Sequence, residues 1–219
     1  IKEPKIYFGT NYGLSEWDIQ THQYKNIQSN ELLNALNGTK VTALYVDNDN
    51  SVWVGTYDGL LGKYDANLNL QKRFRICGMS NNEMQQIVGI NEVGNNNLVV
   101  HTQFHSQILM NFDKNTGESS VFEFFFKGSN VTYSLLNSLR SNNKRELIAV
   151  ISDLGLYHVN WQENVIENKM PELNAQLQGI TISDFYNDSE GNYWITSTTH
   201  GLLYIPVNGA LIKKWSQKE

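Results

Sequence analysis

The chain has 219 residues, 40% of them hydrophobic and 18% charged, so it is long enough to bury a core and too apolar for a disordered tail. The formal net charge of −5 excludes the basic stripe that nucleic-acid-binding surfaces carry, and no stretch approaches the ~18 consecutive apolar residues of a membrane span. The one cysteine, Cys77, excludes an internal disulfide framework and a multi-cysteine zinc site, and we expect it to be buried.

Short strands joined by tight turns are expected along the whole chain. The sequence contains 28 asparagines and only 3 prolines, and 11% of its residues are aromatic. Asparagine is poor inside helices and strands, but it tolerates the left-handed backbone of turns. The apolar runs between these asparagines are short and rich in Val, Ile, Tyr and Trp, which is typical of strands.

One motif recurs along the chain. Residues 6–14, which read IYFGTNYGL, match residues 52–60, which read VWVGTYDGL, almost position for position. Residues 193–202 are a third copy with one extra loop residue, and two weaker copies begin at Leu98 and Leu147. One strand residue of each copy serves as its anchor, and successive anchors are 46, 45, 49 and 47 residues apart; they are Tyr7, Trp53, Leu98, Leu147 and Trp194. This regular spacing indicates a repeat architecture.

Each period contains four predicted strands. In the second period these are residues 41–46, 51–56, 60–64 and 70–76, and the last of them is charged and therefore expected near the rim. The final period repeats the pattern at residues 181–186, 192–197, 202–207 and 211–215. Helical periodicity is nearly absent, and Ser29–Leu36 is the only segment for which we expect one or two helical turns.

These strands predict an all-β fold, a β-propeller of four-stranded antiparallel blades. The blade boundaries are expected at residues 1–40, 41–84, 85–132, 133–180 and 181–219. The first blade begins at its second strand and is therefore incomplete. Either the chain is part of a larger ring, or five blades close around the incomplete one. Of the two we expect a fragment of a larger propeller, in which the open sheet edge pairs with a neighbour.

Two segments carry a family resemblance. Residues 41–60, VTALYVDNDNSVWVGTYDGL, and residues 182–197, ISDFYNDSEGNYWITS, resemble the two-component regulator propeller repeat. That repeat has an apolar strand, an Asp/Gly turn, an aromatic-Val/Ile-Gly-Thr strand and a Gly-Leu pair. The resemblance implies the periplasmic, extracytoplasmic sensor of an inner-membrane hybrid histidine kinase, often one that regulates the use of complex carbohydrates. Related sensors precede diguanylate cyclase domains.

We expect this domain itself to be non-catalytic. The sequence holds no Gly-x-Ser-x-Gly elbow, no phosphate-binding glycine loop and no Cys/His pair at a catalytic spacing, and no motif implies a cofactor. The acidic residues fall mainly in repeat turns. Because propeller loops bring distant segments together, a secreted glycosidase or lyase, or a lectin-like binding module, is the alternative.

No metal site is expected. Residues 47–51 resemble the start of an EF-hand loop, but its sixth position is Val52 instead of Gly, and no helices flank it. A hairpin turn explains the same residues. His101 and His105 are four residues apart on or after a strand, a separation of more than ~10 Å that cannot share an ion unless the chain bends.

The two best motif copies place a tryptophan at the same mid-strand position. Trp53 and Trp194 suit a sugar-stacking surface, but side chains repeated at one position of successive blades are expected in the core between blades. We therefore predict that both tryptophans pack inside the fold.

The loops between second and third strands are the predicted ligand-binding surface, because they vary without disturbing the blade cores. They carry the aromatic, His, Asp and amide side chains that stack on a sugar and hydrogen-bond to it. In the third repeat, Phe104 and His105 replace the usual turn residues. The predicted ligand-binding residues are Tyr12, Tyr57, Asp58, Phe104, His105, Asp153 and His200.

The expected partners are a small molecule or oligosaccharide and another propeller. A sensor transmits a signal only if its ligand binds two arrangements with different affinities. A rigid propeller offers few internal alternatives, so we expect self-association or contact with a neighbouring propeller domain. No nucleic-acid partner and no membrane insertion by this segment are expected.

Overall fold

The computed structural model describes residues 5–27, 40–76, 85–94, 96–103, 107–122, 125–127, 136–141, 146–151, 154–208 and 213–215. The chain divides into two compact units, Ile1–Val121 and Phe122–Glu219. Within the described residues the regular structure is almost entirely β, with one short helix.

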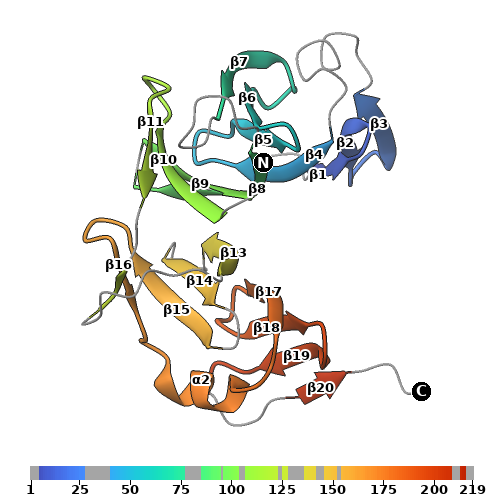
Figure 1. Cartoon of the computed structure of the whole chain (residues 1–219). Coiled ribbons are helices and arrows are strands. Elements are labelled where there is room, and N and C mark those ends of the chain that lie inside the picture. Colours follow the sequence, from blue (N-terminus) through green and yellow to red (C-terminus); the bar gives the residue numbers. More distant parts are fainter. Residues whose placement is uncertain are drawn as a thin grey trace. The chain divides into compact units, whose positions relative to one another are not determined.

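The first unit consists of antiparallel sheets whose strands follow one another in the chain (Figure 1). The first sheet has the strands β1 (Lys5–Thr10), β2 (Gly13–Asp18) and β3 (Gln23–Ile27). The second sheet has β4 (Val41–Val46), β5 (Val52–Thr56), β6 (Leu60–Tyr64) and β7 (Leu70–Arg75). The third sheet has β8 (Gln86–Val93), β9 (Asn97–Gln103), β10 (Gln107–Asp113) and β11 (Ser119–Phe122).

The second unit contains two further sheets and the helix. One sheet has β13 (Leu136–Ser141), β14 (Leu147–Ile151), β15 (Gly155–Asn160) and β16 (Val165–Glu167). A two-residue strand, β12 (Phe125–Phe126), is added parallel to β16 at its edge. The helix α2 (Pro171–Leu177) follows. The last sheet has β17 (Ile182–Asn187), β18 (Tyr193–Ser197), β19 (Gly201–Ile205) and β20 (Lys213–Trp215).

The strands of the second repeat agree closely with the prediction. β4 and β6 have the predicted bounds, and β5 begins at Val52, one residue later than expected. The residue before it, Ser51, belongs to the preceding turn. In this turn Asn50 has a φ of +63°, and the Asp47 N–H donates to the Ser51 carbonyl at 3.0 Å. Four antiparallel strands at the predicted period confirm the blade prediction.

In the last repeat, the bounds of β17, β18 and β19 differ from the prediction by one or two residues, and the largest of these differences is at the end of β19. β19 stops at Ile205, although the sequence pattern predicts a strand to Val207. The physical reason is Pro206, which has no N–H to donate to a neighbouring strand. The segment after it carries Val207, whose side chain is 71% exposed.

The sequence pattern does not predict α2, a helix of seven residues in a fold whose described residues otherwise form β-strands and turns. The side chain of Asn174 holds the helix to β15: its Oδ1 accepts the Leu156 N–H at 2.8 Å, and its Nδ2 donates to the Leu156 carbonyl at 2.9 Å. Leu177 is 1% exposed and belongs to the core of the second unit. The predicted helix Ser29–Leu36 and the cysteine Cys77 lie outside the described residues.

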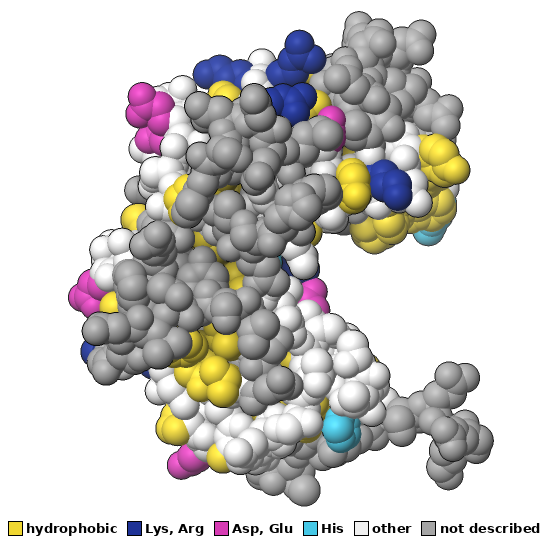
Figure 2. Space-filling view, viewed as in Figure 1, with side chains coloured by type: hydrophobic (Ala, Val, Ile, Leu, Met, Phe, Trp, Pro, Cys, Tyr) yellow, Lys and Arg dark blue, Asp and Glu magenta, His cyan; other side chains and the backbone are white. Residues whose placement is uncertain are grey.

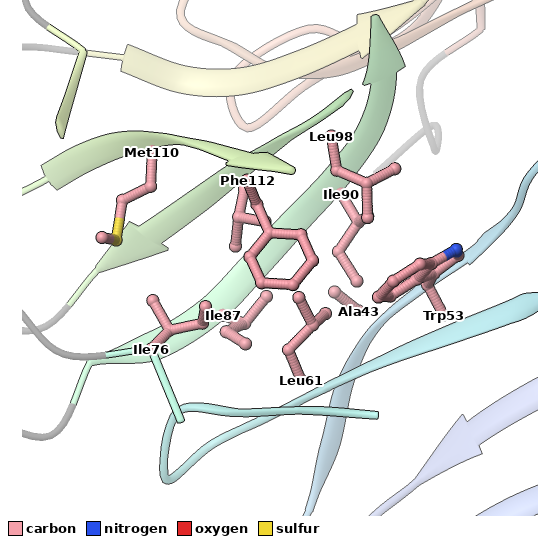
Figure 3. Packing of buried hydrophobic residues seen from close by; sticks show 10 residues of the cluster. Ala43, Trp53, Leu61, Ile76, Ile87, Ile90, Leu98, Met110 and Phe112 are labelled. Carbon is pink, nitrogen blue, oxygen red and sulfur yellow. The ribbon is translucent and has the colours of Figure 1, made fainter. Parts of the chain in front are cut away.

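The second and third sheets share a hydrophobic core (Figure 3). Trp53 is fully buried there, with its ring centroid 5.7 Å from that of Phe112. A β-carbon at Gly55 would lie 2.5 Å from Cγ2 of Ile87, so the glycine of the repeat motif lets the next sheet approach closely. The predicted core position of Trp53 is therefore confirmed.

Trp194 is only half-buried, so the prediction of a core position does not hold for it. It stacks on Trp215 with ring centroids 6.0 Å apart. The sheet face that carries it corresponds to the Trp53 face of the second sheet, but here Tyr186 is 66% and Trp215 49% exposed. This face of the last sheet is therefore open to solvent.

The fourth strand of the second repeat lies at the sheet edge, as predicted from its charges. β7 follows β6 in the strand order, and most of its side chains are exposed, including Lys72, Arg73 and Arg75. Figure 2 shows Lys and Arg side chains gathered over this part of the first unit. An edge strand rich in cations resists pairing with another chain.

Candidate functional site

The β5–β6 turn carries two of the predicted ligand-binding residues, Tyr57 and Asp58. Thr56 holds this turn: its hydroxyl donates to Oδ1 of Asp58 at 2.6 Å and accepts the Leu60 N–H at 2.8 Å. Gly59 follows with a φ of +79°, which favours glycine. The side chain of Tyr57 is left 47% exposed at the tip. The Thr of the repeat motif thus fixes a turn that presents an aromatic ring to solvent.

Two cations that sequence reasoning missed lie beside this turn. Nζ of Lys40 is 5.7 Å from the centroid of the Tyr57 ring, and the Lys40 carbonyl accepts the Tyr57 N–H at 2.9 Å. Nη1 of Arg75 donates to the Asp58 carbonyl at 3.4 Å. Because Lys40 precedes β4 and Arg75 ends β7, only the strand order of the sheet brings both to the β5–β6 end. The turn therefore combines an aromatic face with positive charge.

A buried amide contacts the same turn from the third sheet. Gln85, which precedes β8, is 0% exposed, and a β-carbon at Gly59 would lie 2.8 Å from the Gln85 carbonyl oxygen. Within the described part of the chain, the side-chain nitrogen and oxygen of Gln85 have no hydrogen-bond partner. Buried polar groups are normally hydrogen-bonded, so the Gln85 amide beside the β5–β6 turn departs from that rule.

Tyr12 and His200 occupy turns of the same design. The Tyr12 N–H donates to the Thr10 hydroxyl at 3.1 Å, and the Tyr12 side chain is 76% exposed. The His200 N–H donates to the Ser197 hydroxyl at 3.2 Å, and its Nδ1 is 2.7 Å from the Thr199 hydroxyl. Tyr12 belongs to the first unit with Tyr57, and His200 to the second. The other predicted residues, Phe104, His105 and Asp153, lie outside the described residues.

The loop that resembles a calcium site is a hydrogen-bonded turn. Oδ1 of Asp47 accepts the N–H groups of Asp49 and Ser51 at 3.0 and 2.9 Å, and Oδ2 accepts the Trp53 indole N–H at 2.8 Å. Desolvation raises the pKa of Asp47, but these hydrogen bonds and the charge of Lys114 outweigh it, so the net pKa lies below its ordinary value. The carboxylate is therefore ionised and its oxygens are occupied.

The same carboxylate–indole bond recurs in the last repeat. Oδ2 of Asp188 accepts the Trp194 indole N–H at 3.1 Å, and Oδ1 accepts the Glu190 N–H at 3.0 Å. An Asp six residues before a Trp is thus the sequence signal of this turn. Across the ranges given above, no three His, Cys, Asp or Glu side chains are grouped so that they could hold a metal ion.

The residues that build the β5–β6 turn coincide with a known repeat. Residues 35–58 match the family model described as Two component regulator propeller. The predicted family resemblance is confirmed. The match spans β4, β5 and the turn residues up to Asp58. No curated protein matches the chain.

Solved structures share the propeller fold. The chain is 18% identical to the extracellular domain of BT3049, assigned to a hybrid two-component system of B. thetaiotaomicron, with a TM-score of 0.64 over 99% of this chain and 28% of that one. The corresponding domain of BT4673 from the same organism is 18% identical, with a TM-score of 0.63 over 92% and 26%. The Cps50 (Swd1) β-propeller domain of Myceliophteria thermophila is 10% identical, with a TM-score of 0.59 over 93% and 62%.

These likenesses show the fold, and the predicted β-propeller is confirmed. The chain spans about a quarter of the length of the two Bacteroides extracellular domains. Among the described residues, no helix is both long enough and apolar enough to cross a membrane.

Proposed function

We propose that this propeller is part of the extracytoplasmic, ligand-binding sensor of a two-component signalling protein. The observation that carries the proposal is the family match at residues 35–58, and the fold shared with two extracellular domains supports it. In this proposal the propeller is periplasmic and non-catalytic. A histidine kinase or diguanylate cyclase domain of the same protein supplies the output.

The proposed ligand is an oligosaccharide that binds at the β5–β6 turn of the first unit. The exposed ring of Tyr57 offers a face on which a sugar ring can stack. Lys40 and Arg75 flank that ring and its turn, so a ligand with a carboxylate would gain charge-assisted contacts. Acidic oligosaccharides are therefore the first candidates.

Replacing Tyr57 by Ala is expected to weaken oligosaccharide binding about tenfold or more, the range of an aromatic anchor. Isothermal titration calorimetry with a panel of neutral and acidic oligosaccharides measures the effect. Tyr24→Ala is the matched control, because Tyr24 is also exposed but lies on the edge strand β3. The same titration on Phe104→Ala and His105→Ala tests those two predicted residues.

Two results would remove this proposal. Binding that is the same in Tyr57→Ala as in the unchanged protein would exclude the β5–β6 turn as the ligand site. If chromatography of the reaction mixture shows that the domain consumes an oligosaccharide, the alternative of a secreted glycosidase or lyase is favoured.

We propose that the signal passes through packing between propellers. The open face of the last sheet supports this. Trp215 pairs with Leu202 on that face, and the corresponding pair of the second sheet is Phe74 and Leu61. In the second sheet this pair packs in the core shared with the third sheet, whereas in the last sheet Trp215 is exposed. An exposed apolar face of this kind favours association. Sedimentation velocity is expected to show concentration-dependent self-association that Trp215→Ser weakens. A monomer at all concentrations up to the millimolar range would contradict it.

A further inference from the structure

The second unit holds a cavity of about 740 Å³ at the end of β18 opposite the His200 turn. Its walls come from α2, from the β17–β18 turn and from the segment after β19. A volume of this size lies in the range of sites that bury a small molecule. The helix α2, which the sequence pattern does not predict, supplies one wall of this cavity, and none of the predicted ligand-binding residues that the structure describes lines it.

One side of the cavity is apolar. Leu173 of α2 and Tyr193 of β18 are half-buried and pack against the core of the second unit. Ile205 closes the wall and is only 3% exposed, whereas Val207 stands at the mouth with 71% of its surface exposed. Apolar side chains that stay open to solvent gain free energy when an apolar body covers them.

The charged side chains around the cavity are mainly acidic. Glu146, Glu172 and Glu190 line it against one lysine, Lys169. Nζ of Lys169 is 3.4 Å from Oε2 of Glu167, a carboxylate that it shares with Lys127, so the three glutamates of the cavity outnumber its one lysine. His158 also lines the cavity, with its Nδ1 4.0 Å from Oε2 of Glu146. Three carboxylates around an apolar wall favour a cation over an anion.

We propose that this cavity binds an amphipathic cation, a molecule with an apolar body and an amino or guanidinium group. The apolar body lies against Leu173, Tyr193 and Ile205, and the cation faces the carboxylates of Glu172 and Glu190. The inference goes beyond the proposed sensor site, because it concerns the other unit and the opposite end of the blades. It does not depend on any oligosaccharide binding at Tyr57.

Fluorescence titration with two dansyl probes of opposite charge tests the proposal. Dansylcadaverine carries an apolar ring system and an ammonium group, and dansylglycine carries the same ring system and a carboxylate. Dansylcadaverine is expected to bind with a rise and blue shift of its emission, at least tenfold more tightly than dansylglycine. Raising the salt concentration should reduce this preference, because the carboxylates are largely exposed.

The double variant Glu172→Gln/Glu190→Gln is expected to weaken dansylcadaverine binding about fivefold, as the loss of two exposed charge contacts predicts. Glu163→Gln is the matched control, because Glu163 is exposed in the same unit but does not line the cavity. Val207→Lys places a cation at the mouth of the cavity and should weaken dansylcadaverine binding through charge repulsion. Because Val207 is exposed, this substitution leaves the buried residues of the fold unchanged. Circular dichroism checks that each variant is folded.

Three results would overturn the proposal: equal affinity for the two probes, unchanged binding in Glu172→Gln/Glu190→Gln, or no binding of dansylcadaverine at millimolar concentration. Tyr57→Ala should leave dansylcadaverine binding unchanged. Loss of oligosaccharide binding in that variant with dansylcadaverine binding intact would show that the two sites are separate.

Discussion

Replacing Trp53 by Ala is expected to lower the free energy of unfolding by about 3–5 kcal/mol, the cost of removing a large aromatic side chain from a packed core. Trp53 is fully buried, and its ring packs edge-on against Phe112 and stacks with Phe74. The substitution also removes the indole N–H that donates to the buried Asp47 carboxylate. Urea unfolding followed by far-UV circular dichroism measures the loss as a lower transition midpoint.

Trp194→Ala is the control, because Trp194 fills the same repeat position and makes the same bond to an aspartate. It is only half-buried, so less apolar surface is removed from the fold, and we expect a loss of about 1–2 kcal/mol. Equal losses of unfolding free energy in the two variants would contradict the conclusion that the sheet face carrying Trp53 is packed against a neighbouring sheet and the face carrying Trp194 is open to solvent.

The strands could be predicted because their signals are local. Alternation of apolar residues and polar turns every few positions predicts β4 and β6 with the bounds that the structure shows. The Gly-Thr pair of the motif is explained by the fold: Gly55 admits the next sheet, and Thr56 holds the turn. The placement of Tyr57 at an exposed tip follows from the same local pattern.

The other features depend on contacts between distant residues. α2 has seven residues, its N-cap residue makes no side-chain hydrogen bond, and Asn174 anchors it to β15, 18 residues away. β12 is two residues long and pairs with a strand about 40 residues later. Lys40 and Arg75 meet the Tyr57 turn only through the strand order of the sheet. No periodicity of the sequence encodes such contacts.

A buried ionic cluster is the clearest of these distant contacts. Lys114, in the turn after β10, donates to Glu92 of β8 and lies 3.4 Å from Oδ2 of Asp47. The side chains of Lys114, Asp47 and Glu92 are only 4%, 0% and 4% exposed. The cluster therefore joins the second sheet to the third by charge, next to the Trp53 core.

Lys114→Met is expected to destabilise the protein by about 3–5 kcal/mol at pH 7, because it leaves two carboxylates buried without a cation. Lys72→Met is the matched control: Lys72 is exposed on β7, so its replacement should leave the stability unchanged. Adding Glu92→Gln to Lys114→Met removes one of the two uncompensated charges and is expected to restore part of the loss. Urea unfolding at constant ionic strength measures all three variants.

The pH dependence of this loss gives the sharper test. Burial lowers the pKa of Lys114, but the hydrogen bond to Glu92 and the neighbouring carboxylates outweigh it, so the net pKa is raised above 10.5. Its contribution is therefore fully present below pH 10.5 and is lost as the pH rises through the raised pKa. The pKa of Asp47 is lowered from 3.8, so its contribution is present above that pH and is lost as the pH falls through the lowered value.

Between these limits the contributions of Lys114 and Asp47 to the stability of the unchanged protein are constant. Without Lys114, the two carboxylates repel each other in a buried site, and the pKa of Asp47 is expected to rise because the charge of Lys114 no longer lowers it. Protonation then relieves the repulsion, so the stability gap between Lys114→Met and the unchanged protein should narrow as the pH falls from 7 towards 4. A gap that stays constant over this range would show that the lysine acts through its packing and that its charge does not stabilise the junction of the two sheets.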